Sequence, residues 1–334
     1  MSEKEPLLRV ERLYRSFRSA GLLAPGSSVR AVDDVSLCIG RGETYGLVGE
    51  SGCGKSTLGR CILRLIEPDA GQVFFEGEDF LKLRGRRVRS LRRRMQMVFQ
   101  DPYLSLDPKM RIGSALMEAL AIHGMGSRKE RFDRAMTLLL RMGFSPEHFF
   151  RFPHEFSGGQ RQRIGLARAL ILEPSLIVCD EPVSALDVSV QAQIINLMKD
   201  IQEERGVSYL FIAHNLSVVR YISHRVGVMY LGSLAEEAET EELFRKPAHP
   251  YTQALLASAL EPDPRRIMEH TALQGEVPSP VRHDGQEEVR GCAFALRCPH
   301  AREKCRCSRP ELAPVGHGAG HRAACFYPLQ TPEA

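Results

Sequence analysis

The order of apolar segments along the chain predicts β-strands that alternate with α-helices. Residues 176–179 and 209–213 are continuous apolar runs, which are typical of strands buried on both faces of a sheet. The other predicted strands are residues 7–17, 31–48 (two strands around Gly40-Arg41-Gly42), 71–76 and 95–100, and the predicted helices are residues 55–66, 111–145 (two stretches that break near 124–127), 157–171 and 188–204. This alternation predicts an α/β fold with a mostly parallel sheet covered by helices.

The pattern weakens toward the C-terminus. From about residue 240 onward, proline and glycine become more frequent and the regular spacing fades. We therefore expect a boundary near residues 235–250. It separates a main domain over residues 1–240, with a helical subdomain at about 105–170, from an extension over residues 241–334.

Length and composition are those of an ordinary globular protein: 334 residues, 43% hydrophobic, 26% charged and a net charge of +4. We find no run of about 18 apolar residues and no signal-peptide pattern at the N-terminus, so we expect neither a membrane span nor secretion. The arginine-rich residues 82–94 have no aromatic residues interleaved with the charges. They predict a solvated helix face, and we expect no nucleic-acid partner.

The most specific motif lies at residues 49–56, which fit the phosphate-binding pattern G-x-x-x-x-G-K-S/T. Its glycines let backbone N–H groups curve around phosphates, Lys55 can reach the phosphates as a point charge, and the Ser56 hydroxyl can bind Mg²⁺. A helix that begins near Lys55 adds its positive end to the anion site. The nucleotide-binding residues expected from this motif are Gly49, Glu50, Ser51, Gly52, Cys53, Gly54, Lys55, Ser56 and Thr57.

Two further motifs carry polar groups suited to the same chemistry. Asp180 and Glu181 end a buried strand, where Asp180 could hold Mg²⁺ through its water shell and Glu181 could orient or deprotonate a water. Ser157, with two glycines after it, stands at a predicted helix start that could bind an anion or be an ordinary N-cap. Because the chain already holds phosphates at residues 49–56, this second start suggests a site completed by another subunit.

In this order, the motifs resemble those of the ATP-binding cassette (ABC) ATPases. They are the loop at 49–56, then Phe156-Ser157-Gly158-Gly159-Gln160, Asp180-Glu181, residues 184–187 and His214, with Phe156 in place of the family's usual leucine. The resemblance implies a P-loop NTPase core with an antiparallel β subdomain and an α-helical subdomain. It also implies that two ATP molecules lie between two such domains, each held by residues 49–56 of one domain and residues 157–160 of the other.

The resemblance also implies individual roles. Gln100 links Mg²⁺ and the attacking water to the membrane partner, Asp187 acts across the dimer, and His214 contacts the γ-phosphate. Phe17 stacks on adenine, with Tyr14 as the alternative. The catalytic set is thus Glu181, His214 and Gln100, and the Mg²⁺ ligands are Ser56, Gln100 and Asp180.

Residues 100–108, 186–193 and 249–252 are similar to segments of the oligopeptide and dipeptide importer ATPases. This implies an ATP-hydrolysing subunit at the cytoplasmic face of the cell (inner) membrane. Its implied partners are two permease subunits, a sibling ATPase that forms a heterodimer with it, and an extracytoplasmic peptide-binding protein. A nickel importer ATPase of the same branch and an ABC ATPase outside transport are the alternatives. The presence of Gln100, Glu181 and His214 argues against a degenerate regulatory subunit.

Five of the nine cysteines crowd near the C-terminus, at positions 292, 298, 305, 307 and 325. Four thiolates suit a structural zinc or an iron–sulfur cluster, although the spacing is wider than the C-x2-C pairs of zinc ribbons. The resemblance implies that some family members bind a 4Fe-4S cluster here, so we expect Cys292, Cys298, Cys305 and Cys325 as ligands, with Cys307 as a substitute for Cys305. The alternative is a set of free thiols.

Overall fold

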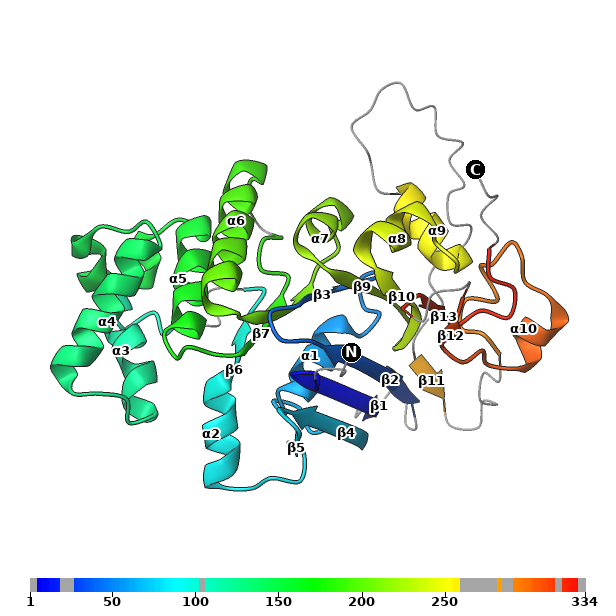
Figure 1. Cartoon of the computed structure of the whole chain (residues 1–334), viewed down its shortest axis with the longest axis horizontal. Helices are drawn as coiled ribbons and strands as arrows, with labels where there is room; N and C mark the ends of the chain where they lie inside the picture. Colours follow the sequence, from blue (N-terminus) through cyan, green and yellow to red (C-terminus); the bar gives the residue numbers. More distant parts are fainter. Residues whose placement is uncertain are drawn as a thin grey trace.

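The computed structural model describes residues 5–18, 27–101, 106–184, 186–258, 281–283, 291–315 and 320–329. Its larger sheet has eight strands in the order β12-β13-β10-β9-β3-β8-β7-β6 (Figure 1). Five neighbours, β9, β3, β8, β7 and β6, run parallel, and β10, β13 and β12 add antiparallel strands at one side. The bounds are β3 Thr44–Val48, β6 Met95–Val98, β7 Leu176–Asp180, β8 Ser208–Ile212, β9 Arg225–Tyr230, β10 Ser233–Glu239, β12 Ala313–Pro314 and β13 Arg322–Ala323.

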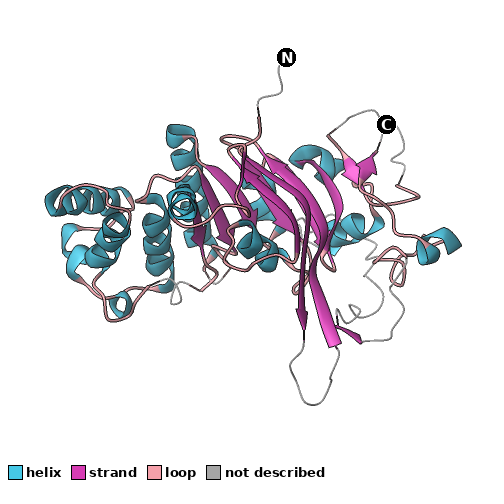
Figure 2. Ribbon diagram, turned by 90° about the horizontal axis from the view of Figure 1, so that it is seen from below, coloured by secondary structure: helices cyan, strands magenta, loops and turns pink. Residues whose placement is uncertain are grey.

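The second sheet is antiparallel throughout and has the order β11-β2-β1-β4-β5. Its strands are β1 Leu8–Arg18, β2 Ser27–Ile39, β4 Ala70–Phe75, β5 Glu78–Asp79 and β11 Val281–His283. Figure 2 shows the strands of both sheets gathered in the middle of the molecule. Both the parallel core and the antiparallel β subdomain expected from the sequence are therefore confirmed.

The helices flank the sheets, with α3, α4 and α5 at one end of the molecule and α10 at the other (Figure 1). They are α1 Lys55–Ile62, α2 Arg86–Arg94, α3 Ile112–Ile122, α4 Arg128–Arg141, α5 Gly158–Leu170, α6 Val188–Arg205, α7 Leu216–Ile222, α8 Thr240–Arg245, α9 Pro250–Ser258 and α10 Glu303–Cys307, with 3-10 turns at Pro146–Phe150 and Pro153–Glu155. In the described part of the chain, no helix combines the length and the apolar character needed to cross a bilayer.

The structure corrects one predicted helix and confirms another. The predicted helix at 55–66 was too long: α1 ends at Ile62, because Arg64 adopts a left-handed backbone conformation with φ of 52°. The arginine-rich segment does form a solvated helix, since Leu91 is the buried residue of α2. Residues 102–105, in the segment after Gln100, and residue 185 lie outside the described residues.

The continuous apolar run of β7 follows from its position between two cores. Ile177 and Cys179 pack into the core shared with the helical end of the molecule. Leu176 and Val178 pack into the core shared with the antiparallel sheet. Successive side chains of a strand point to opposite faces, so a strand covered on both faces needs apolar residues at every position. The strand therefore holds its terminal carboxylate, Asp180, at a fixed place.

The extension joins both sheets of the main domain. β11 pairs with β2 of the antiparallel sheet, and β13 pairs with β10 of the larger sheet. The boundary near residue 240 remains a prediction, but the chain beyond it is tied to the core by these strand pairs.

A buried ion pair also fastens the extension. Nε2 of His321 lies 2.7 Å from Oε1 of Glu236, and its Nδ1 lies 3.1 Å from Oε1 of Glu242. Glu236 is fully buried and also accepts hydrogen bonds from the backbone N–H groups of Ala248 and His249. The hydrogen bond to Glu236 raises the pKa of His321, against the opposing effect of burial. Burial lowers the pKa of the neighbouring His249 to about 4, so its ring is neutral. The positive charge opposite Glu236 is thus carried by His321.

This pair predicts that the stability of the protein depends on pH. Because the folded-state pKa of His321 is raised above its unfolded value of 6.5, the pair contributes fully below that pH. Its contribution is lost as pH rises through the folded pKa. We expect His321→Gln to lower the free energy of unfolding by about 2 kcal/mol at pH 6 and by less at pH 9, measured by chemical denaturation. A difference between the two proteins that does not change with pH would contradict this assignment.

Candidate functional site

The candidate site lies where parallel strands end. β3, β8, β7 and β6 are neighbours and point the same way, so their carboxyl ends share one edge of the sheet. Residues 49–56 follow β3, Glu181 follows β7, His214 comes after β8, and Gln100 comes after β6. In parallel sheets this edge is where ligands bind. The topology therefore brings together four motifs that are far apart in sequence.

Residues 49–56 form a tight loop that requires glycine at two positions. Gly49 has φ of 151°, and a Cβ there would lie 2.1 Å from the carbonyl oxygen of Met229. Gly54 has φ of 108°, and a Cβ there would lie 1.9 Å from the carbonyl oxygen of Ala31. Backbone contacts this close leave no room for a side chain. The loop is thus shaped by packing against β2 and β9.

Lys55 starts α1 and folds back over this loop. Its side chain is buried, and its Nζ donates hydrogen bonds to the carbonyl oxygens of Gly49 at 2.8 Å and Glu50 at 2.9 Å. The same Nζ lies 3.5 Å from Sγ of Cys53. The ammonium group and the N–H groups at the start of α1 lie at the same loop, as a phosphate site requires.

Ser56 and Asp180 connect the loop to β7. The Ser56 hydroxyl donates a 2.6 Å hydrogen bond to Oδ1 of Asp180, and Nη2 of Arg60 lies 3.6 Å from Oδ2. Asp180 is fully buried, and its Oδ2 has no hydrogen-bond partner among the described residues. Burial raises the pKa of Asp180, while Ser56, Arg60 and Lys55 act against that shift. A hydroxyl beside a buried carboxylate oxygen of this kind fits Mg²⁺, which prefers oxygen ligands.

Glu181 is the meeting point of the candidate catalytic residues. Nε2 of Gln100 donates a 2.9 Å hydrogen bond to Oε2 of Glu181, and Nδ1 of His214 lies 3.4 Å from the same oxygen. Glu181 has φ of 46°, in the left-handed region that non-glycine residues rarely adopt, and its N–H is held by the carbonyl of Ile212 at 2.9 Å. Such strain clusters at functional sites. Gln100 and His214 are exposed, so this cluster opens to solvent.

Among the remaining predicted residues, four are exposed, namely Ser157, Gly158, Asp187 and Phe17, whereas Thr57, Gly159 and Gln160 are half-buried. Ser157 accepts a hydrogen bond from the N–H of Gln160 and the Gln160 side chain accepts one from the N–H of Ser157, which makes Ser157 a true helix N-cap. Asp187 is the exposed N-cap residue of α6. A Cβ on Gly159 would lie 2.7 Å from Cγ1 of Val190, so the starts of α5 and α6 pack together. Phe17 on β1 is 37% exposed, with the Arg15 guanidinium 4.8 Å from its ring centroid.

The expected 4Fe-4S cluster is wrong, and so is the zinc alternative. Within the described residues, which include all five C-terminal cysteines, no group of three or more His, Cys, Asp or Glu side chains is arranged to hold a metal ion. Cys292, Cys298, Cys305 and Cys325 instead line a cavity of about 20 Å³, room for about one water. Burial raises the pKa of the Cys292, Cys298 and Cys325 thiols. Cys307, the proposed substitute for Cys305, is exposed.

Sequence reasoning missed two residues that touch the loop at residues 49–56, the candidate phosphate loop. Arg297 and Tyr251, both beyond residue 240, contact Glu50. Tyr251 belongs to a segment noticed only as a family marker, and a single arginine in the extension gave no local signal.

Comparisons with known proteins agree with this geometry. The sequence profile of the ABC transporter family matches residues 32–184, and that of the "Oligopeptide/dipeptide transporter, C-terminal region" matches residues 235–305. The chain is 51% identical over 316 residues to the "Probable peptide ABC transporter ATP-binding protein y4tS" of Sinorhizobium fredii, covering 94% of this chain and 88% of the relative. It is 49% identical over 321 residues to the "Oligopeptide transport ATP-binding protein AppF" of Bacillus subtilis, covering 95% of each.

Solved structures give the same result. A dimeric ATP-binding cassette, MJ0796, in a post-hydrolysis state with ADP and Pi, has a TM-score of 0.63 and 27% identity, covering 70% of this chain and 98% of that one. The chain therefore belongs to the ABC transporter family and is an ATPase of that family. Within it, the chain belongs to the group whose members carry the oligopeptide/dipeptide transporter C-terminal region.

Proposed function

We propose that this chain hydrolyses ATP to drive the import of dipeptides and oligopeptides through membrane permease subunits. The observation that carries the proposal is the cluster at the sheet edge, where Ser56 bonds Asp180 and where Gln100 and His214 approach one oxygen of Glu181. The C-terminal region and the named function of similar proteins support peptides as the substrate class.

In this mechanism the chain's own residues bind ATP, orient the attacking water and remove a proton from it. Lys55 and the N–H groups of residues 49–57 hold the phosphates of ATP, and Phe17 stacks on the adenine. Ser56, Asp180 and Gln100 would hold Mg²⁺, which supplies positive charge to the phosphates when bound. Glu181 takes a proton from the attacking water, while Gln100 and His214 orient that water and the γ-phosphate. The charge that develops in the transition state is stabilised by groups that are already in position. Such electrostatic stabilisation is usually the largest contribution to catalysis in sites of this kind.

The second half of each site comes from another subunit. Ser157, Gly158, Gly159 and Gln160 stand at the start of α5, where Ser157 and Gly158 are exposed. In the proposed dimer they contact the ATP held by residues 49–57 of the partner, and Asp187 acts across the same interface. We expect the partner to be a sibling ATPase, so that the active unit is a heterodimer.

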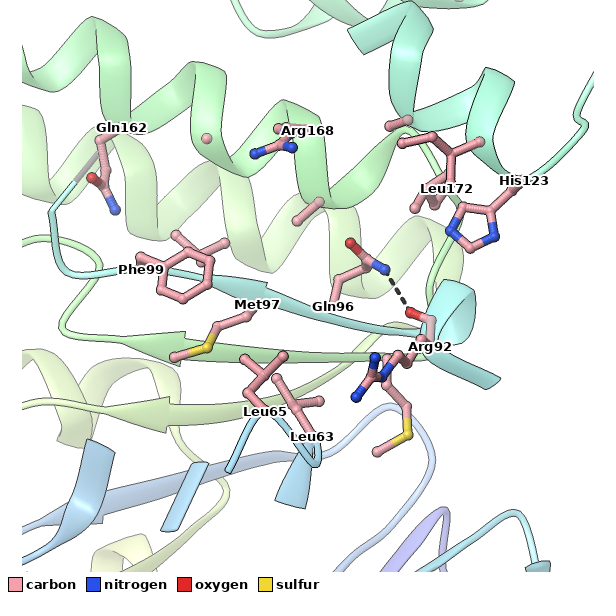
Figure 3. Close-up of a pocket in the computed structure, with 16 residues that line it drawn as sticks. Leu63, Leu65, Arg92, Gln96, Met97, Phe99, His123, Gln162, Arg168 and Leu172 are labelled. Carbon is pink, nitrogen blue, oxygen red and sulfur yellow. Dashed lines mark hydrogen bonds between the residues drawn. The ribbon is translucent and has the colours of Figure 1, made fainter. Parts of the chain in front are cut away.

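The permease subunits dock on a groove beside β6. This groove of about 280 Å³ is lined mainly by apolar side chains, which include Ile122. Figure 3 labels four others, Leu63, Leu65, Met97 and Phe99. Leu65 is 50% exposed and Ile122 is 58% exposed, although both are large and apolar. Phe99 directly precedes Gln100, whose amide bonds Glu181. A permease segment in this groove is thus one residue from the catalytic cluster. We expect the chain to lie at the cytoplasmic face of the membrane, with an external binding protein in the complete importer.

The central catalytic prediction concerns Glu181. Replacing it by Gln keeps the size and most hydrogen bonds of the side chain but removes the base, so ATP hydrolysis should fall by about 10²- to 10⁴-fold while ATP binding persists. Glu203→Gln, an exposed position on α6, is the matched control and should leave hydrolysis unchanged. Hydrolysis in Glu181→Gln at the rate of the unmodified protein would refute the role of Glu181.

The substrate class needs the complete assembly. We expect ATPase activity of this chain, purified with its permease and sibling subunits, to rise when binding protein and peptide are added. Stimulation by nickel but not by peptides would indicate a nickel importer. Activity that responds to neither, with no permease purifying alongside, would indicate an ABC ATPase outside transport.

A further inference from the structure

The C-terminal extension reaches the phosphate loop through one ion pair. Arg297 places Nη1 2.8 Å from Oε2 of Glu50 and Nη2 3.0 Å from Oε1, so the guanidinium and carboxylate form a bidentate pair. The Arg297 side chain is 6% exposed and the Glu50 side chain is 21% exposed. Pairs with two parallel hydrogen bonds fix orientation as well as distance. This pair joins residues that are 247 positions apart in the chain.

An earlier residue of the extension also holds the backbone of Glu50. The N–H of Glu50 donates a 3.0 Å hydrogen bond to the hydroxyl of Tyr251. Tyr251 is fully buried, and its ring packs against Tyr230 and Phe294, with centroids 4.6 Å and 5.4 Å away. Aromatic packing of this kind fixes where the hydroxyl points. Both the side chain and the N–H of Glu50 are therefore bound by residues beyond position 240.

The carbonyl of Glu50 is bound from the other side. It accepts a hydrogen bond from Nζ of Lys55, the lysine proposed to reach the phosphates. Glu50 thus stands between the extension and Lys55, and a movement of Arg297 or Tyr251 changes the position of the carbonyl that Lys55 contacts. Glu50 also places a negative charge in a loop proposed to hold phosphates, where like charges repel. Arg297 is the cation that neutralises it.

We propose that Arg297 and Tyr251 are positioning residues for the phosphate loop, so that the affinity for ATP depends on the docked C-terminal extension. The inference rests on the proposed role of residues 49–57 in phosphate binding. It adds that the extension takes part in nucleotide binding without touching the nucleotide.

A second arginine of the extension provides a control. It distinguishes positioning of the phosphate loop from attachment of the extension to the core. Arg309 bonds Oδ2 of Asp33 at 3.0 Å, the carbonyl of Asp33 at 2.9 Å and the hydroxyl of Ser233 at 2.8 Å. It therefore fastens the extension to the core as Arg297 does, but its hydrogen bonds go to β2 and β10 rather than to residues 49–56. Arg309→Ala is the matched control for Arg297→Ala.

The test measures the ATP dissociation constant, kcat and thermal stability of the full chain in four variants, with Lys55→Ala as a fifth that tests the phosphate site itself. Arg297→Ala should weaken ATP binding about tenfold, the effect of losing about 1.4 kcal/mol, with kcat less affected. Arg297→Lys should lie between, because it keeps the charge but loses the bidentate geometry. The double variant Arg297→Ala with Glu50→Gln should recover part of the lost affinity, because no unpaired charge remains. Arg309→Ala should lose stability but keep its ATP affinity.

Several results would overturn the proposal. Unchanged ATP affinity in Arg297→Ala would do so, and so would equal losses in Arg297→Ala and Arg309→Ala, which would mean that any loosening of the extension has the same effect. If Arg297→Ala does not fold, unchanged affinity in Arg297→Lys would overturn the proposal instead. A Lys55→Ala variant that still binds ATP normally would overturn both this inference and the proposed phosphate site. Loss of binding in Lys55→Ala beside unchanged binding in the Arg297 variants would overturn the inference alone.

Discussion

The alignment of parallel strands is the constraint on which the rest of this structure depends. Strands β3, β8, β7 and β6 end at one edge, and the 2.6 Å hydrogen bond from Ser56 to Asp180 joins the loop after β3 to the end of β7. Asp180 is held there by β7, which apolar packing fixes on both faces. The polar cluster at this edge is thus positioned by apolar residues that take no part in the chemistry.

Sequence motifs predicted the positions of several candidate site residues, because each motif stands next to a predicted strand. Gly49 and Glu181 directly follow a strand and Asp180 ends one, so strand prediction and motif together were enough to put them at strand ends. The helix after the loop was predicted too long, since apolar spacing continues past Ile62 while the backbone turns at Arg64. Periodicity reports which positions are apolar, but it does not report φ.

Inferences about the extension were less successful for a physical reason. Cysteine spacing gives the separation of thiols along the chain, whereas metal binding depends on where side chains point and how much space lies between them. The four cysteines do line one small cavity, but they are not arranged to hold a metal ion. Tyr251 and Arg297 lie 201 and 247 positions from Glu50 in the sequence, and no local sequence pattern predicts contacts over such separations. The strands that join the extension to both sheets are two or three residues long, too short to be recognised from alternation.

The most direct test of the account is the affinity for ATP with and without Mg²⁺, measured by calorimetry on the unmodified chain and on Asp180→Asn. If the edge of the sheet is the nucleotide site, Mg²⁺ will strengthen ATP binding by the unmodified chain, and Asp180→Asn will lose that gain while remaining folded. Equal strengthening by Mg²⁺ in both proteins would contradict the account, because the metal and the phosphates would then bind somewhere other than the cluster of Ser56, Asp180 and Glu181.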